Sequence, residues 1–253
     1  MTIAVAGKGG TGKTTVCGIL IEYLSKKNDG AVLAVDADPN SNLNEVLGVE
    51  LPATLGDIRE QMLRGEADGG EVPAGMTKQE YAEFRFGDAL VEGARYDMLV
   101  MGRTQGKGCY CFVNGVLKTQ VDKHSAAYRY IVVDNEAGME HISRGILPAI
   151  DVLLLLSDSS RRGVQAAGRI ARMAEELKLN PGKVGLVVNR TPGGVPDPGV
   201  LEEVAAQKLE LLGALPDDQA VYRYDCEGRP SSAVPEDSPV KQALRPIIEK
   251  LGL

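Results

Sequence analysis

The fold of this chain is decided by Ala6-Gly7-Lys8-Gly9-Gly10-Thr11-Gly12-Lys13-Thr14-Thr15. This stretch fits the pattern G-x-x-x-x-G-K-[ST], and it follows an apolar run at residues 2–6 and precedes a helix-like run that starts at Lys13. A strand, a glycine-rich loop and a helix in that order are typical of a loop that binds phosphate groups. The sequence therefore predicts a nucleoside triphosphate site at the end of the first strand.

Each residue type in this loop has a chemical reason to be there. Without a Cβ atom, Gly9, Gly10 and Gly12 allow backbone N–H groups to curl around phosphate oxygens. The N-terminus of the following helix adds its positive dipole end. Lys13 supplies a charge for the outer phosphates, and the Thr14 hydroxyl is placed to ligate Mg²⁺. The predicted phosphate-binding residues are Gly9, Gly10, Thr11, Gly12, Lys13, Thr14 and Thr15.

Apolar runs of strand length recur along the chain, with helix-like stretches between them. We expect strands at 2–6, 31–36, 97–101, 130–134, 151–157, 183–189 and 210–215, and helices at 13–25, 112–123, 161–179 and 239–251. Several runs are apolar throughout, which is typical of parallel strands covered on both faces. The pattern predicts one α/β domain over residues 1–253, with a doubly wound, mainly parallel sheet of about seven or eight strands flanked by helices. Residues 65–88 are expected to form a surface excursion, partly helical from Thr77.

The composition argues against nucleic-acid and membrane partners. The 253 residues carry 28 Lys and Arg against 35 Asp and Glu, a formal net charge of −7, which argues against a nucleic-acid binder with a basic surface. No apolar run approaches the roughly 20 residues that cross a bilayer, and the first residues lack the basic start of a secretory signal. We therefore expect a cytoplasmic protein without a membrane partner.

Carboxylates end two of the expected strands. Asp36 and Asp38 follow the second run, and Asp134 ends the fourth. Ligands of open α/β sheets bind at the carboxyl ends of strands, so these side chains are expected at the phosphate site. Asp134, after an apolar run, is a candidate to hold Mg²⁺ through water. The chain lacks the N-K-x-D motif typical of guanine-specific GTPases, so ATP is favoured over GTP.

A pair of cysteines, Cys109 and Cys111, lies in a glycine-rich stretch before the expected helix at 112–123. If this stretch is extended, both sulfurs face one point and can bind a metal. Two thiolates do not complete a tetrahedral set, and neither His124 nor His141 lies at ligand spacing. Either other groups complete the site or a two-fold dimer contributes the pair twice. The alternatives are a redox pair and two core cysteines; Cys17 and Cys226 are interpreted as incidental.

With Lys8, the loop reads K-G-G-x-G-K-[ST] and resembles the deviant Walker A class of ATPases. That resemblance implies that Lys8 reaches across a homodimer interface to the partner's nucleotide. It implies that Asp38 orients the attacking water and that Gly138, four residues after Asp134, senses the γ-phosphate. It also implies the nucleoside-facing residues, with the asparagine amide reading the edge of adenine; these residues are Asn189, Arg190, Pro216 and Asp217.

Together with Cys109 and Cys111, these motifs resemble the nickel-insertion ATPases of carbon monoxide dehydrogenase maturation (the CooC-type branch) over nearly the whole chain. The resemblance implies an ATP-dependent homodimer that holds one Ni²⁺, or Zn²⁺ in the same site, and delivers nickel to carbon monoxide dehydrogenase. Residues 139–142 lack the second cluster cysteine of the nitrogenase iron protein. Two alternatives stay open: an iron–sulfur reductase, and a positioning ATPase whose last helix, 240–251, associates with a membrane instead of packing on the sheet.

Overall fold

The computed structural model describes residues 1–67, 72–103, 109–137 and 149–253. Its centre is a seven-stranded sheet in the order β3-β2-β4-β1-β5-β6-β7, and each pair of neighbouring strands is parallel. The strands are β1 (Thr2–Gly7), β2 (Val32–Ala37), β3 (Asp97–Val100), β4 (Tyr130–Asn135), β5 (Val152–Ser157), β6 (Lys183–Thr191) and β7 (Leu211–Pro216). The doubly wound parallel sheet is confirmed, and each expected strand is present with ends shifted by one or two residues.

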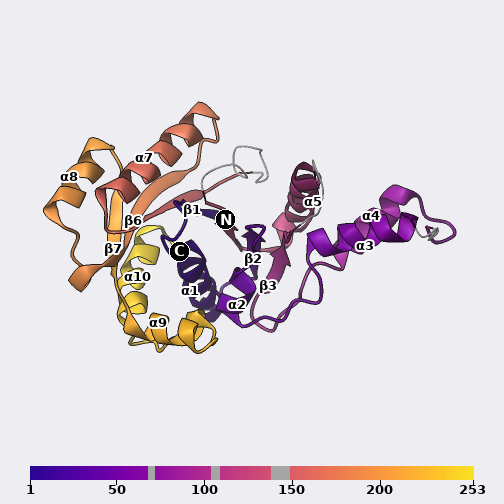
Figure 1. Cartoon of the computed structure of the whole chain (residues 1–253), viewed down its shortest axis with the longest axis horizontal. Helices are drawn as coiled ribbons and strands as arrows, with labels where there is room; N and C mark the ends of the chain where they lie inside the picture. Colours follow the sequence, from indigo (N-terminus) through magenta and orange to yellow (C-terminus); the bar gives the residue numbers. More distant parts are fainter. Residues whose placement is uncertain (68–71, 104–108, 138–148) are drawn as a thin grey trace.

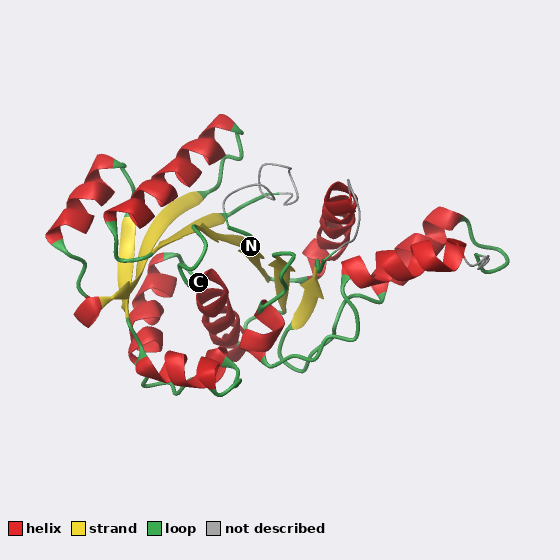
Figure 2. Ribbon diagram, in the orientation of Figure 1, coloured by secondary structure: helices red, strands yellow, loops and turns green. Residues whose placement is uncertain are grey.

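Alternate residues of the central strands feed different hydrophobic clusters, which explains why the strands are apolar throughout. Ile3 and Val5 of β1 pack in the same cluster as Leu20, whereas Ala4 and Ala6 pack with residues of the opposite face. The helices accordingly cover both faces of the sheet (Figures 1 and 2). The helices with described bounds are α1 (Lys13–Lys27), α2 (Leu43–Leu47), α3 (Leu55–Ala67), α4 (Lys78–Gly87), α5 (Cys109–His124), α7 (Arg161–Glu176), α8 (Pro198–Ala206), α9 (Gln219–Cys226) and α10 (Pro239–Lys250).

The segment between β2 and β3 contains more helix than expected. Helices α3 and α4 form an arm that projects from the sheet at the β3 edge (Figure 2). Helix α4 starts after Thr77, whose hydroxyl accepts from the Glu80 N–H while the Glu80 carboxylate accepts from the Thr77 N–H, a capping box that confirms the expected start. Helices α2, α3, α8 and α9 were not among the expected elements.

Helix α10 packs on the sheet. Val240, Leu244 and Ile247 of its apolar face are buried in the same cluster as the strand residues of β1 and β7. That face is therefore used inside the fold. Within the described ranges, no helix is both long enough and apolar enough to span a bilayer.

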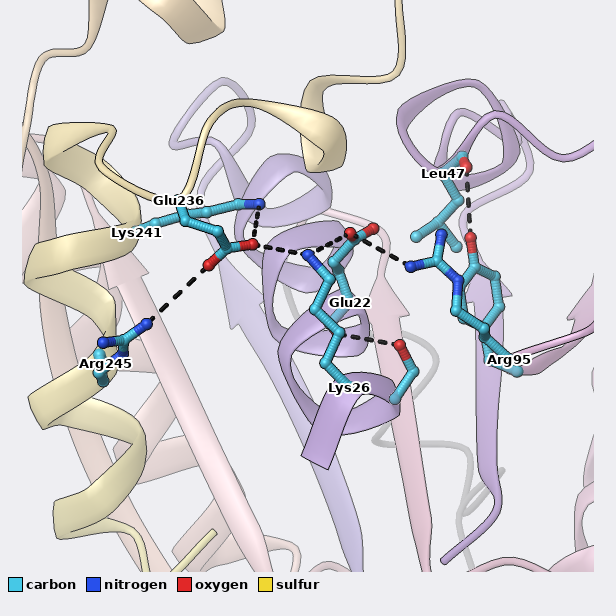
Figure 3. A network of polar contacts seen from close by, with 9 residues as sticks. Glu22, Lys26, Leu47, Arg95, Glu236, Lys241 and Arg245 are labelled. Atoms are coloured by element: carbon cyan, nitrogen blue, oxygen red, sulfur yellow. Dashed lines mark hydrogen bonds and ion pairs between the residues drawn. The ribbon is translucent and has the colours of Figure 1, made fainter. Parts of the chain in front are cut away.

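A network of charged side chains anchors helix α1 at the end far from the phosphate-binding loop (Figure 3). The nearly buried Glu22 pairs with Lys26 at 2.8 Å and with Arg95, which precedes β3, at 3.5 Å. Lys26 also contacts Glu236 at 2.6 Å, and Glu236 pairs with Lys241 of α10 at 3.2 Å. These ion pairs thus tie the C-terminal half of α1 to Arg95 before β3 and to helix α10.

Candidate nucleotide-binding site

The phosphate-binding loop has the backbone that its glycines permit. Gly10 and Gly12 adopt φ values of +79° and +87°, which side chains with a Cβ atom rarely adopt. Gly12 is the N-cap of α1 and provides no side-chain cap, so the first N–H groups of the helix remain available to an anion. The Thr11 hydroxyl donates to the Lys8 carbonyl at 2.9 Å and closes the loop.

Strand β6 holds this loop from the side. Asn189 Nδ2 donates to the Thr11 carbonyl at 2.8 Å, and Asn189 Oδ1 accepts from the Arg190 N–H at 2.9 Å. Arg190 Nη1 donates to the Gly10 carbonyl at 3.3 Å. A Cβ atom on Gly12 would overlap Asn189 Nδ2. The resemblance assigned the Asn189 amide to reading adenine; in the structure its oxygen and its nitrogen both bond to backbone groups, and its contact with a base stays a prediction.

Two adjoining cavities run along the loop. The larger, of about 1050 Å³, is lined by the loop itself, by the segment after β2 and by residues that follow α9. The smaller, of about 370 Å³, lies between the ends of β6 and β7 and helix α9. Residues that line both are Gly12, Thr15, Arg190, Asp225 and Ser231. One continuous cleft therefore has a phosphate end and an end suited to a nucleoside.

Most of the predicted site residues line this cleft. The predicted residues in its walls are Gly9, Gly10, Gly12, Lys13, Thr14, Thr15, Asp38, Asn189, Arg190, Pro216 and Asp217. Sequence reasoning missed Tyr222 and Asp225 of α9 and Arg229 after it, because α9 itself was not expected. A signal for α9 was present in Asp218, which caps that helix by accepting from the Ala220 N–H at 2.8 Å.

Asp36 and Asp134 lie side by side on neighbouring strands, where they are register partners in the β2–β4 ladder. Both are buried. Burial, and after it the Asp134 carboxylate, raises the pKa of Asp36 to about 7. Burial also raises the pKa of Asp134 to about 6, against the Thr14 hydroxyl and the Lys13 charge, which lower it.

The oxygen ligands at this point suit a hard divalent cation. Asp134 Oδ1 is buried and has no hydrogen-bond partner among the described residues. The Thr14 hydroxyl lowers the pKa of the Asp134 carboxyl, so a hydroxyl and a carboxylate with an unsatisfied oxygen lie near one another at the phosphate end. Mg²⁺ takes oxygen ligands of this kind together with water and substrate phosphates. The donor set therefore fits the predicted Mg²⁺ site.

The segment after β2 is held by its own carboxylates. Asp36 accepts from the Asp38 N–H through Oδ1 and from the Leu43 N–H through Oδ2, both at 3.0 Å. Asp38 Oδ1 in turn accepts from Asn40 N at 2.8 Å and from Asn40 Nδ2 at 3.0 Å. Asp38, the predicted water-orienting residue, thus lines the cleft on a loop whose two ends are tied to one buried side chain.

Lys8 behaves differently from Lys13. Lys13 is buried beneath the loop, with 8% of its surface exposed. Lys8 is exposed and is not among the residues that line the cleft of its own chain. This position agrees with the expectation that Lys8 serves a partner's nucleotide, which stays a prediction.

The backbone expected at the cysteine pair needs correction, whereas metal binding by the pair stays a prediction. Helix α5 begins at Cys109, so Cys109 and Cys111 belong to a helical turn, and the extended backbone assumed above is wrong. In a helix, positions two apart do not face one another. The side chains of both cysteines, and the whole of Gly138, lie outside the described residues. Within the described part, no cluster of three or more His, Cys, Asp or Glu side chains is placed to hold a metal. Cys17, interpreted as incidental, is a buried core residue, and burial raises the pKa of its thiol.

Comparison with known proteins identifies the family. The model of the CobQ/CobB/MinD/ParA nucleotide-binding domain matches residues 2–231. This chain belongs to that family. It is a P-loop ATPase of the MinD/ParA class, as the phosphate-binding loop predicted.

Relatives from several organisms resemble this CobQ/CobB/MinD/ParA-family ATPase over nearly its full length. An uncharacterized ATP-binding protein of Methanocaldococcus jannaschii is 42% identical, covering 99% of this chain and 98% of the relative. The carbon monoxide dehydrogenase accessory protein CooC of Rhodospirillum rubrum is 31% identical, covering 90% and 88% respectively. The septum site-determining protein MinD of Pyrococcus horikoshii, solved with Mg-ADP, is 21% identical with a TM-score of 0.72, covering 99% and 96%, and it shows a shared fold.

Proposed function

We propose that this ATPase is a metallochaperone that carries nickel on Cys109 and Cys111 and releases it to carbon monoxide dehydrogenase. The observation that carries the proposal is a Cys-x-Cys pair at the first turn of α5, in a chain whose 31% identical relative is named as an accessory protein of that enzyme. Thiolates bind zinc as well as nickel, so the same site would take Zn²⁺. ATP binding and hydrolysis would drive loading and release.

The nucleotide chemistry follows from the cleft. The loop N–H groups and Lys13 bind the phosphates, and Thr14 and Asp134 would hold Mg²⁺, which offsets charge on the β- and γ-phosphates. Asp38 orients a water molecule, whose oxygen attacks the γ-phosphorus. The bond from that phosphorus to the bridging oxygen breaks, and ADP and inorganic phosphate result. Lys8 of a second chain would contribute a positive charge to the same phosphates.

A homodimer would solve the ligand shortage at the metal. Two thiolates from one chain leave a tetrahedral ion incomplete, and two chains related by a two-fold axis supply four. Cys109 and Cys111 start a helix, and positions two apart on a helix do not face one another, so one chain alone is poorly suited to enclose the ion. The proposal therefore depends on the pair being shared between subunits.

Anaerobic native mass spectrometry with metal analysis tests this assignment. We expect one Ni²⁺ per dimer for the wild-type protein and for Cys226→Ala, whose cysteine is exposed and on α9. The double variant Cys109→Ala with Cys111→Ala should lose the ion and retain ATP binding. Stoichiometric nickel in the double variant would contradict the site. An iron-dependent EPR signal in place of nickel would favour the reductase alternative.

A further inference from the structure

The turn that follows β3 is joined to the nucleotide cleft by a line of side-chain hydrogen bonds. Arg103 Nη2 donates to Asn40 Oδ1 at 2.5 Å, and Asn40 Nδ2 donates to Asp38 Oδ1 at 3.0 Å. Asn40 itself lines the cleft. An arginine outside the cleft therefore connects, through one amide, to the carboxylate predicted to orient water.

The backbone of the same turn bridges the end of β2 and the start of helix α3. Met101 N donates to the Asp36 carbonyl at 2.9 Å, and the Met101 carbonyl accepts from Gly56 N at 2.9 Å. Asp36 lies just before the loop that carries Asp38, and Gly56 lies in the first turn of α3. The turn after β3 thus contacts both the end of β2, next to the loop that carries Asp38, and the base of the α3–α4 arm.

Close packing makes this contact stiff. Gly102 has φ +70°, and a Cβ atom there would overlap the Thr54 side chain. A Cβ atom on Gly56 would overlap the Arg103 carbonyl oxygen. Two backbones that approach this closely cannot slide independently, because protein interiors have few voids to absorb a shift. A displacement of Arg103 would therefore reach the start of α3.

Helix α3 packs against α5. Ile58 of α3 is buried with Val113 and Leu117 of α5 in one hydrophobic cluster, against which Met62 also packs. Helix α5 begins at Cys109. From Asp38 to Val113 and Leu117 on the buried face of α5, the described contacts are thus continuous, through Arg103 and the base of α3.

We infer that Arg103 is a positioning residue that links the nucleotide state at Asp38 to the placement of α3 and of α5, the helix that begins at Cys109. When Asp38 turns toward a water molecule at the γ-phosphate, its Oδ1 bonds to Asn40 must change, and Asn40 carries the change to Arg103. The metal part of this inference rests on the proposed function. Because coupling is reciprocal, nickel should alter nucleotide affinity by the same factor by which nucleotide alters nickel affinity.

Hydrogen–deuterium exchange tests the link without any metal. In the wild-type protein, we expect amide exchange across 54–67 to differ by about fivefold or more between the Mg-ATP and Mg-ADP states, the lower end of ordinary coupling. In Arg103→Ala, the exchange rates of the Mg-ATP and Mg-ADP states should differ by less than about twofold. Arg162→Ala removes an exposed arginine of α7 and should retain the wild-type response. A full nucleotide response in Arg103→Ala would overturn the inference.

A double-mutant cycle shows whether the effect runs through the amide. Asn40→Ala removes the acceptor of the Arg103 bond, so it should suppress the exchange difference as Arg103→Ala does, and the two changes together should add nothing. Arg103→Lys keeps the charge and one donor, and should restore part of the response. Additive effects of the two alanine changes would show that Arg103 acts by another route and would contradict the inference.

Nickel binding separates this inference from the proposed function. Isothermal titration with NiCl₂ should give an affinity that changes with bound nucleotide in the wild-type protein and stays constant in Arg103→Ala. A wild-type protein that binds no nickel would refute the proposed function, and the exchange experiment would still decide the role of Arg103. Nickel binding whose nucleotide dependence survives in Arg103→Ala would refute the inference and leave the proposed function standing.

Discussion

Asn189 donates a hydrogen bond of 2.8 Å to the Thr11 carbonyl and so joins strand β6 to a phosphate-binding loop that lies 178 residues earlier in the chain. The bond is buried, and only 6% of the Asn189 surface is exposed. The shape of the loop therefore depends on a side chain from the far half of the sheet.

Removing that side chain should weaken both stability and nucleotide binding. Asn189→Ala leaves the Thr11 carbonyl buried without its partner, which costs about 1–3 kcal/mol. We expect a loss of unfolding free energy in that range and weaker binding of a fluorescent ATP analogue. Asn189→Asp should be worse, because a carboxylate cannot donate and brings negative charge toward the phosphates. Wild-type values for both quantities in Asn189→Ala would contradict the role.

Asp36 should matter for the order of the loop that carries Asp38. An Asp36→Asn amide has one acceptor oxygen, whereas the carboxylate accepts from both the Asp38 N–H and the Leu43 N–H. We expect faster hydrogen exchange at one or both of these amides. We also expect ATP turnover to fall about tenfold or more, which is a smaller loss than that expected when a positioned acid–base group is removed. Unchanged exchange at both amides would show that the loop is held by other contacts.

Loss of the Asp38 carboxylate should separate binding from hydrolysis. Asp38→Ala is expected to bind ATP while steady-state phosphate release falls about 10²–10⁴-fold, the contribution of a positioned acid–base side chain. Asp237→Ala removes an exposed carboxylate outside the cleft and should hydrolyse ATP normally. Normal turnover in Asp38→Ala would exclude it as the water-orienting residue.

Lys8 should be needed for dimer formation driven by nucleotide. In the Asp38→Ala background, which is expected to bind ATP without hydrolysing it, light scattering should detect dimers with Lys8 present and monomers in Lys8→Ala. Lys8→Ala removes the positive charge that would contact the phosphates of the partner's nucleotide. Arg162→Ala tests for a general effect of removing one surface cation. Equal dimer fractions with and without Lys8 would rule out a role in trans.

The hydrogen bond between Tyr128 and Asp97 predicts a stability change at high pH. The Tyr128 hydroxyl donates to Asp97 Oδ2 at 2.6 Å, and burial, together with Asp97, raises the pKa of Tyr128. In the unfolded chain the tyrosine ionises near pH 10, while in the folded protein it keeps its proton, so its contribution is complete below about pH 10 and falls as the pH rises. Urea denaturation should show a steeper loss between about pH 9.5 and 11 for wild type than for Tyr128→Phe. Parallel curves would contradict this assignment.

The strands and the start of α4 could be predicted from the sequence because a few neighbouring residues determine them. The strands are apolar on both faces because helices cover both faces of the sheet. The continuous apolar run Val152–Ser157 therefore predicts a buried strand. The capping residues Thr77 and Glu80 marked the start of α4. The error at Cys109 and Cys111 has an equally local cause. Helix α5 is driven by Val113, Leu117 and Val121, which recur every four residues on its buried face, and the helix extends backward over the cysteines.

The amino-acid order alone determined a phosphate-binding loop between a strand and a helix, because glycine conformations and hydrophobic periodicity act over a few residues. Only the tertiary structure decided which distant side chains meet there. The strand order β3-β2-β4-β1-β5-β6-β7 sets Asp36 beside Asp134 and brings Asn189 to Thr11. Those pairings depend on how the crossover helices bury their apolar faces across the whole sheet, and no short stretch of the chain contains that information.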